Sequence, residues 1–468
     1  MTSPPAPAPM TTKGYRLIPL PYTSLAVEVK LASYLFALHH TGMEKASLRG
    51  WLIWLVVSLF YLYELILRIV PSVIVPDLMH DFSLTATGVG ALSVFYYYAY
   101  APIQLPVGLL IDRYGARWQL ILACLVCVIG TFLFAQAHSE GLLAASRLLV
   151  GLGSAFAWVA VTYLISHWFP PRQRGLLIGL GSSVGLLGGI GGQGPMVLFT
   201  DAIGWRAANH TLALCGIILA FFLWLIVRDA PKNVPHHKGP SLSSAFRGMR
   251  AVALNPQSWL CALFSVLLYL CVSVLAELWG ISSLESAHHL TPFESGCGTS
   301  LIYFGMLIGG PLIGFISDRT HRRKPFMIGG ALCAALSLAC VIFISHLSVA
   351  LIYLLLFCFG FALGAQLLSF SLIIEVNDPT AKGSALAFNN FITMIGGMVM
   401  QPLVGWLLDL GWNGVGGATR TYSASDYRFA LAALPISCLV GAVFALLVRE
   451  TYGTRRDGKR HPFEAHSD

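Results

Sequence analysis

Charged residues are scarce in this sequence of 468 residues, where Asp, Glu, Lys and Arg together make up 11%. Soluble domains carry about a quarter of charged residues, so this chain has too few to cover a water-exposed surface, and 56% of its residues are hydrophobic. The scarcity excludes a disordered chain, a solenoid with a polar exterior and a secreted disulfide scaffold. The composition therefore predicts an integral membrane protein.

Signatures of enzymes are also missing. The sequence contains no H-E-x-x-H motif and no G-x-x-x-x-G-K-[ST] loop, so nothing indicates a zinc hydrolase or an ATP-driven pump. The ten cysteines lie almost entirely within apolar stretches, as is typical of small buried side chains. We therefore expect no enzyme activity, no metal and no cofactor.

Long apolar runs dominate what is present. A membrane-spanning helix needs ~20 mainly apolar residues, and twelve such runs with short polar breaks occur between Trp51 and Val448. The longest break, 229–256, follows the sixth run, so the sequence predicts an all-α membrane protein with two six-helix halves. The predicted spans are 51–78, 86–111, 118–137, 140–169, 174–200, 208–228, 257–284, 295–316, 325–345, 348–375, 383–409 and 427–448.

Positive charge marks one side of the predicted membrane. Alternate breaks carry most of the Lys and Arg residues, because clusters lie at 113–117, 172–174 and 319–324, whereas the other breaks hold only Arg206, Arg420 and Arg428. Lys and Arg gather in cytoplasmic loops, so the basic side is predicted to be cytoplasmic. The net charge of +8 then reflects topology and requires no nucleic-acid partner.

These signals give a domain plan for a protein of the cell (inner) membrane with both termini in the cytoplasm. The Pro-rich start lacks the basic-then-apolar pattern of a signal peptide, and Met43 is a candidate for an alternative start. The plan comprises a cytoplasmic tail at 1–50, six-helix halves at 51–228 and 257–448, a cytoplasmic linker at 229–256 and a cytoplasmic tail at 449–468.

The two halves repeat each other. The loop after the second run reads G-L-L-I-D-R-Y-G-A-R from Gly108, and a related G-F-I-S-D-R starts at Gly314, 206 residues later. Gln193 and Gln401 form another matched pair, 208 residues apart. Repeated signals in equivalent positions of a six-plus-six chain indicate a duplicated six-helix unit.

On these motifs the sequence resembles the major facilitator superfamily from Trp51 to Val448. The repeated loop looks like that family's motif between helices 2 and 3, and Arg147-x-x-x-Gly151-x-Gly153 is similar to its helix 4 motif, found in many proton-coupled members. The helix 5 signature of drug exporters is only partly present, as Gly194-Pro195. The resemblance implies two pseudo-symmetric six-helix bundles around a central cavity.

The repeated loop is expected to act as a conformational switch. Its two glycines would allow close helix contact, and its carboxylates could accept from the neighbouring arginines or cap a helix of the other half. These contacts would form when the halves close on the cytoplasmic side. The alternative is a simple turn stabiliser. The predicted switch residues are Gly108, Asp112, Arg113, Gly115, Arg117, Gly314, Asp318 and Arg319.

Ionisable residues inside the spans are few, which makes each a functional candidate, because an unpaired charge in hydrocarbon costs roughly 2.5–3.5 kcal/mol or more. Glu64 and Arg68 lie in span 1, Arg147 in span 4 and Glu277 in span 7. The resemblance implies that spans 1, 4, 7 and 10 line the cavity. The charges therefore fall on the cavity helices.

Two interpretations of these charges stay open. Glu64 and Arg68 could form an i,i+4 ion pair that neutralises itself. Alternatively, Arg68 and Arg147 bind a substrate carboxylate or phosphate, while Glu64 or Glu277 binds a proton or a substrate amine. A desolvated carboxylate takes up a proton more readily. Tyr97 and Gln366 are further substrate-binding candidates, although such residues more often pack helices.

The expected function is proton-coupled uptake of a small organic anion or zwitterion by a monomeric secondary transporter with alternating access. An amino acid, a short peptide or a sugar acid would suit two cavity arginines. Export of drug-like or siderophore-like compounds is the alternative among transporters. A transporter-like membrane receptor without flux is the alternative of another class.

Overall fold

A computed structural model describes residues 48–230, 242–412, 414 and 420–450 of the chain. Every element in these ranges is helical, which confirms the predicted all-α class. By length and composition, eleven helices of the described residues can cross a membrane, or up to twelve if the bent pair Ala86–Gln104 and Pro106–Tyr114 is one span. Residues 1–47, including Met43, and 451–468 lie outside the described residues.

With the bent pair counted as one span, the described spans fall into two sets of six. The N-terminal half contains α2 (Leu48–Val73), α3 (Val75–Phe82), α4 (Ala86–Tyr114), α5 (Arg117–Ala135), α6 (Glu140–Ser154), α7 (Ala157–Trp168), α8 (Pro171–Gly191), α9 (Gly194–Ile203) and α10 (Trp205–Ile226). Helix α11 (Leu242–Ala253) lies in the predicted linker.

The C-terminal half has the same plan with more interruptions. It contains α12 (Pro256–Val274), the π-helix η1 (Leu275–Trp279), α13 (Gly280–His288), α14 (Pro292–Thr320), α15 (Lys324–Phe343), α16 (Val349–Leu363), η2 (Gly364–Leu367), α17 (Leu368–Glu375), η3 (Pro379–Ala381), α18 (Lys382–Gly411), α19 (Ala424–Leu431) and α20 (Ala433–Leu447). Elements η1 and η2 each interrupt one span. These two spans correspond to predicted spans 7 and 10.

One predicted boundary needs correction. The first apolar run was expected to extend over 51–78, but α2 ends at Val73 and a separate short helix, α3, begins at Val75. Pro76 lies in the first turn of α3, where a missing backbone N–H costs nothing. The fourth run, expected over 140–169, corresponds to one candidate span, Glu140–Trp168, which α6 and α7 form with a short break at 155–156.

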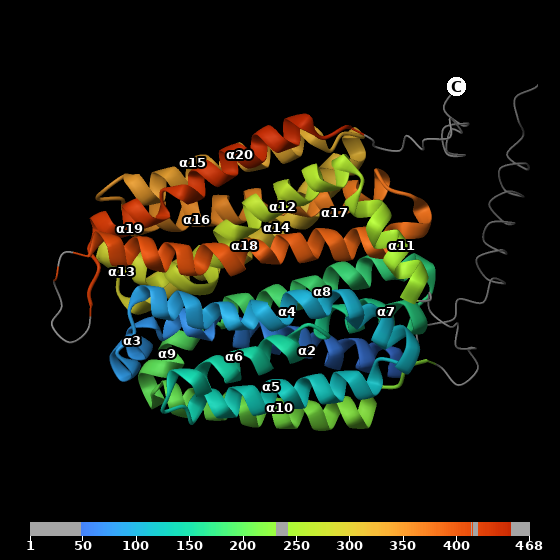
Figure 1. Ribbon diagram of the computed structural model, residues 1–468, viewed down its shortest axis with the longest axis horizontal. Coiled ribbons are helices and arrows are strands. Elements are labelled where there is room, and N and C mark those ends of the chain that lie inside the picture. The colour runs from blue at the N-terminus through green and yellow to red at the C-terminus, as the bar shows by residue number, and fades with distance from the viewer. Residues whose placement is uncertain (1–47, 231–241, 413, 415–419, 451–468) are drawn as a thin grey trace, which may run out of the picture. The chain divides into compact units, whose positions relative to one another are not determined.

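The two halves touch through paired helices. Figure 1 shows the blue-to-green helices of the N-terminal half beside the yellow-to-red helices of the C-terminal half, with α4 and α18 side by side. Glycines permit this approach: a Cβ at Gly90 would lie 2.7 Å from the Gln401 carbonyl oxygen, and one at Gly405 would lie 2.3 Å from that of Ala86. Helix α14 likewise packs on α8 and α9.

The contact between the halves is uneven along the spans. We call the end with the loops at 114–117, 168–171 and 320–324 the basic end, and the other the opposite end. All hydrogen bonds between the halves among the described residues lie in the middle or toward the opposite end. At the basic end, a Cβ at Gly108 or Gly314 would meet nothing within 4 Å. The helix contact predicted for these glycines is therefore absent from this conformation.

A carboxylate holds each of the repeated loops at the basic end. Gly115 has a φ of +81°, and a Cβ there would lie 2.6 Å from the carboxyl group of Asp229. That carboxylate accepts from the backbone N–H of Arg117 at the start of α5 (2.8 Å). In the other half, Glu450 accepts from the backbone N–H of Lys324 at the start of α15 (2.9 Å). Anions suit helix N-termini, so both loops are fastened within their own half.

The ion pairing of the second loop differs from the expectation. Arg319 and a helix N-terminus of the other half were the two partners considered for Asp318, but the described ion pair joins Asp318 Oδ1 to Arg323 Nη1 at 3.5 Å. Arg323 also donates to Glu375 at the end of α17 (2.7 Å). A basic residue at the start of the next helix thus lies closer than the sequence neighbour, because α14 continues to Thr320.

A further carboxylate, Asp409, fastens the halves to each other at the opposite end. Asp409 on α18 accepts from the backbone N–H of Thr87 (2.9 Å) at the start of α4, and also from Arg420 (3.0 Å). Tyr422 donates to Asp409 (2.5 Å) and accepts from the backbone N–H of Ala86 (3.0 Å). Asp409 thus caps a helix of the other half.

Replacing Asp409 with asparagine should loosen this end, because the amide keeps one acceptor and loses the charge. The closed contact should lose about 1–1.5 kcal/mol of stability, which corresponds to a roughly tenfold larger population of molecules open at this end. Cys297, which packs on Gly194 between the halves, reports it through maleimide labelling in a background without the other cysteines. Asp426→Asn, which changes a cap within one half, is the control. An unchanged labelling rate of Cys297 in Asp409→Asn would contradict the cap.

Candidate functional site

Arg68 is the centre of a buried charge cluster within the spans. Its side chain is 8% exposed and projects from α2, one turn after Glu64. Arg68 Nη2 lies 3.2 Å from Glu64 Oε1, so the i,i+4 ion pair considered from sequence is present. Arg68 Nη1 also lies 3.9 Å from Glu277 Oε1. One guanidinium is thus shared by carboxylates from both halves.

Tyrosines complete the cluster. Tyr96 on α4 accepts from Arg68 Nε (2.9 Å) and donates to Glu64 (3.1 Å). Tyr269 on α12 accepts from Arg68 Nη1 (3.2 Å) and donates to Glu277 (2.9 Å). The guanidinium carbon also lies 4.9 Å from the ring centre of Tyr100, within cation–π range. The cluster therefore satisfies its buried charges through phenols as well as ion pairs.

Glu277 reaches this cluster from an irregular stretch of helix. It lies in the π-helix η1, is 4% exposed, and accepts from Tyr97 as well as from Tyr269. π-Helical turns are rare and occur often at functional sites. The predicted residues Glu64, Arg68, Tyr97 and Glu277 are therefore brought together across the two halves.

Arg147 has a different environment. It is 4% exposed, and its terminal nitrogens donate to the backbone carbonyls of Leu67 (2.9 Å) and Arg68 (3.2 Å). Pro71 lies within α2, and a proline lacks the N–H that would bond the carbonyl four residues earlier, which is that of Leu67. Arg147 thus supplies the donor that Pro71 withholds, and it holds the backbone that carries Arg68.

The remaining candidate, Gln366, lies apart from the charges. It is in η2 and donates to Ser265 on α12 (2.9 Å), inside the C-terminal half. This is the helix-packing role weighed from the sequence. A G-x-S-x-G pattern at Gly181–Gly185 lies inside α8, where Ser183 donates to the carbonyl of Gly179 (3.1 Å). A helical position lacks the sharp strand-to-helix turn of a nucleophile elbow.

Sequence reasoning missed three of the four tyrosines around Arg68, namely Tyr96, Tyr100 and Tyr269. The run F-Y-Y-Y-A-Y at 95–100 was a usable signal, because tyrosines are concentrated in it. In the structure, three of its phenols are nearly inaccessible. Sequence reasoning also missed the V-R-D at 227–229 and V-R-E at 448–450, whose carboxylates cap α5 and α15.

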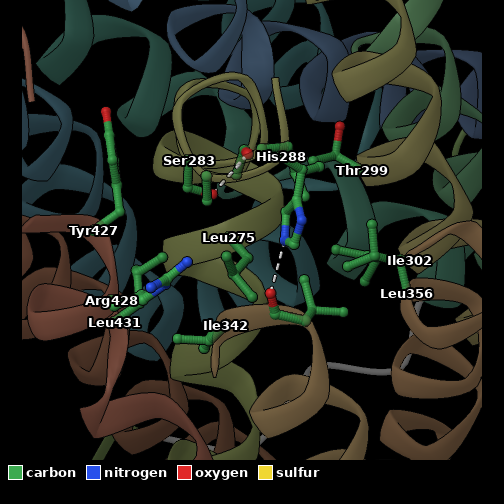
Figure 2. A pocket seen from close by; sticks show the side chains of 14 residues that line it. Leu275, Ser283, His288, Thr299, Ile302, Ile342, Leu356, Tyr427, Arg428 and Leu431 are labelled. Atoms are coloured by element: carbon green, nitrogen blue, oxygen red, sulfur yellow. Dashed lines mark hydrogen bonds between the residues drawn. The ribbon is translucent and has the colours of Figure 1, made fainter. Parts of the chain in front are cut away.

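A small cavity lies on another face of the π-helical span, within the C-terminal half. Figure 2 shows its mainly apolar lining, with the His288 ring bonded to the Val341 carbonyl (2.8 Å) and the Arg428 side chain at one side. None of the clustered charges lines it. Among the described residues, no group of His, Cys, Asp and Glu could hold a metal ion.

Arg147→Ala should lower the melting temperature and uptake, because the Leu67 carbonyl loses its donor. Pro71 gives a matched test: Pro71→Ala restores a backbone N–H for that carbonyl, so the double variant should regain stability with a coupling of about 1–3 kcal/mol. Thermal unfolding of the two single variants and the double variant measures this coupling. Additive losses of stability would contradict the assignment, and recovered stability without recovered uptake would make Arg147 a substrate ligand.

Comparisons with known proteins agree with this architecture. The family model described as Major Facilitator Superfamily matches residues 53–287 and 265–466. The chain is 33% identical to the uncharacterized transporter YybO of Bacillus subtilis (strain 168) over 157 residues, which span 34% of this chain and only 36% of that protein. It is 25% identical to the hexuronate transporter of the same organism, over 72% of this chain and 83% of that protein.

Two further likenesses are informative. The membrane sensor protein UhpC of Escherichia coli (strain K12) is 23% identical over 76% of this chain and 83% of its own length. A bacterial homologue of the human lysosomal transporter Spinster, solved in an inward-facing and unoccupied conformation, superposes with a TM-score of 0.69 at 20% identity, covering 88% of this chain and 98% of the other. The family match spans nearly all the described helices, and the chain therefore belongs to the major facilitator superfamily of membrane transporters.

Proposed function

We propose that this protein is a secondary transporter that takes up a small organic anion together with a proton by alternating access. The observation that carries the proposal is the sharing of Arg68 between Glu64 and Glu277, at 3.2 Å and 3.9 Å. A guanidinium binds carboxylates and phosphates through paired donors. A substrate anion would therefore compete with Glu277 for the same group.

This competition supplies a coupling mechanism. Glu64 is on the same helix as Arg68, whereas Glu277 belongs to the other half, so displacement by substrate breaks a link between the halves. A buried carboxylate without its cationic partner is costly, and protonation removes that cost. Proton binding at Glu277 would thus accompany anion binding at Arg68. Protonated Glu277 is neutral, and so is Arg68 when it is paired with the substrate anion, and this state would let the halves move.

Among the anions, a sugar acid is the proposed substrate class. The likeness to a hexuronate transporter supports it, and so does the setting of Arg68, because the phenols of Tyr96, Tyr97 and Tyr269 offer donors and acceptors that suit substrate hydroxyls. An added carboxylate together with an added proton leaves the net charge of the cluster unchanged.

Uptake of radiolabelled D-glucuronate by proteoliposomes tests the proposal. We expect accumulation driven by an inward proton gradient and its loss when a protonophore collapses that gradient, with D-glucose as the neutral control. Uptake that is indifferent to the gradient would contradict proton coupling. Equal uptake of D-glucose would contradict anion selectivity.

A receptor without flux is the second candidate, favoured by the likeness to the membrane sensor protein UhpC. The same buried arginine would bind an anion in either case. Saturable D-glucuronate binding to the purified protein without any flux in liposomes would select the receptor, whereas gradient-driven accumulation would select the transporter.

A further inference from the structure

Two glutamines that the repeat pairs in sequence meet the same span in space. Gln193 lies between α8 and α9, and Gln401 lies in α18, and both are buried, at 0% and 1% exposed. The Gln193 side-chain amide donates to the carbonyl of Ala276, and that of Gln401 donates to the carbonyl of Ser273 (2.7 Å). Both carbonyls belong to the span that carries Glu277, and the mechanism proposed above uses neither glutamine.

The π-helix explains why this span accepts side-chain donors. The N–H of Gly280 bonds the carbonyl of Leu275, five residues earlier. Where the backbone hydrogen bonds of a helix return from i→i−5 to i→i−4 spacing, one carbonyl receives no backbone N–H donor. The carbonyl after that of Leu275 is the one of Ala276, and there Gln193 donates. Trp279 in turn donates to the backbone carbonyl of Gln401 (3.1 Å).

We infer that Gln193 and Gln401 are positioning residues that hold the π-helix η1 and so keep Glu277 against Arg68 and Tyr97. The two amides bond the span on both sides of Leu275, within four residues of Glu277. This inference rests on the proposed function, in which Glu277 takes up the proton. Without the two donors, the π-turn would relax toward regular helix and turn Glu277 away from the cluster.

The two glutamines differ in the half to which they belong. Gln193 comes from the N-terminal half, and its side-chain oxygen accepts from Thr299 of the other half (2.8 Å). The next residue, Gly194, donates its N–H to Ser300 (3.3 Å). If the halves separate at the opposite end, Gln193 leaves the carbonyl of Ala276, whereas Gln401 moves with its own half. The position of Glu277 therefore depends on closure of that end.

The small cavity in Figure 2 lies beside this span. Leu275, Gly280 and Thr299 are among its lining residues, so it borders the π-helix and the partner of Gln193. Well-packed interiors resist backbone shifts, and an unfilled space beside η1 lowers that resistance. The same span thus has both a removable donor and a gap in the packing beside it.

Hydrogen exchange of the purified full-length protein in nanodiscs tests the inference independently of transport. In Gln193→Met and Gln401→Met, we expect amides of the peptide 272–283 to exchange at least tenfold faster than in the parent protein. Asn209→Leu is the matched control, because Asn209 is a buried amide that donates to the carbonyl of Trp205 within its own helix (2.8 Å). Unchanged exchange at 272–283 in both methionine variants would overturn the inference.

Transport distinguishes positioning from a general structural role. Gln193→Met should lower gradient-driven D-glucuronate uptake about tenfold and leave D-glucuronate counterflow within twofold, and Gln193→His, which keeps an N–H donor, should restore the driven uptake. Equal losses of both activities would overturn the inference.

If Gln193→Met does not fold, Thr299→Val serves instead, because it removes only the bond to the Gln193 oxygen and the bonds within α14. Gradient-driven uptake by Glu277→Gln would contradict the proposed function alone, since hydrogen exchange still decides whether the amides hold η1.

Discussion

Arg68→Lys is expected to lower gradient-driven uptake of D-glucuronate by at least about a hundredfold in proteoliposomes. The guanidinium of Arg68 reaches Tyr96, Tyr269 and Glu64 through separate nitrogens and lies 3.9 Å from Glu277. A lysine ammonium is a point charge with its donors on one atom, so it cannot keep this set of contacts. A hundredfold loss corresponds to about 2.7 kcal/mol, the scale of one charge-assisted bidentate contact.

The lysine variant is preferred to a neutral one because Arg68→Ala would leave two buried carboxylates without their cation. Breaking a buried ion pair in this way costs about 3–5 kcal/mol, and the protein would then fail for reasons unrelated to substrate. Arg206→Lys is the matched control, since Arg206 pairs with Asp81 (2.5 Å) at the opposite end, outside the cluster. Uptake by Arg68→Lys within twofold of the parent would contradict the role of Arg68 as the anion ligand.

The buried charges were predictable from the sequence because the cost of a charge in hydrocarbon does not depend on details of packing. The four predicted charges are all less than 10% exposed, namely Glu64, Arg68, Arg147 and Glu277. The fold class follows from the same scarcity of charged residues. The distribution of partners was not predictable in this way. Arg147 is as buried as Glu277, but it bonds backbone carbonyls beside Pro71.

The π-helix and its glutamines show why the rest of the site needed the structure. Nothing in the letters L-A-E-L-W at 275–279 distinguishes a π-turn from a regular helix, because the difference is one backbone bond spacing. The repeat did pair Gln193 with Gln401, but pseudo-symmetry would predict that each contacts the equivalent span of the opposite half. Both glutamines instead donate to the same span, the one that contains the π-helix η1.

Glu277→Gln is expected to abolish gradient-driven accumulation of D-glucuronate while counterflow of D-glucuronate continues. Glutamine has the shape of a protonated glutamate, and it can still accept from Tyr97 and Tyr269. Arg68 keeps its partner Glu64 in this variant, so the anion site remains balanced. Exchange of bound substrate therefore continues, but no proton can be gained or lost at position 277.

Glu64→Gln separates the two candidate proton sites. Glu64 is on the same helix as Arg68, so the link between them does not change when the halves move, whereas the link between Arg68 and Glu277 does. A proton site that drives transport must respond to that movement. We therefore expect Glu64→Gln to weaken uptake without uncoupling it from the gradient. Loss of gradient-driven accumulation in Glu64→Gln, with accumulation retained in Glu277→Gln, would move the proton site to Glu64 and contradict the mechanism.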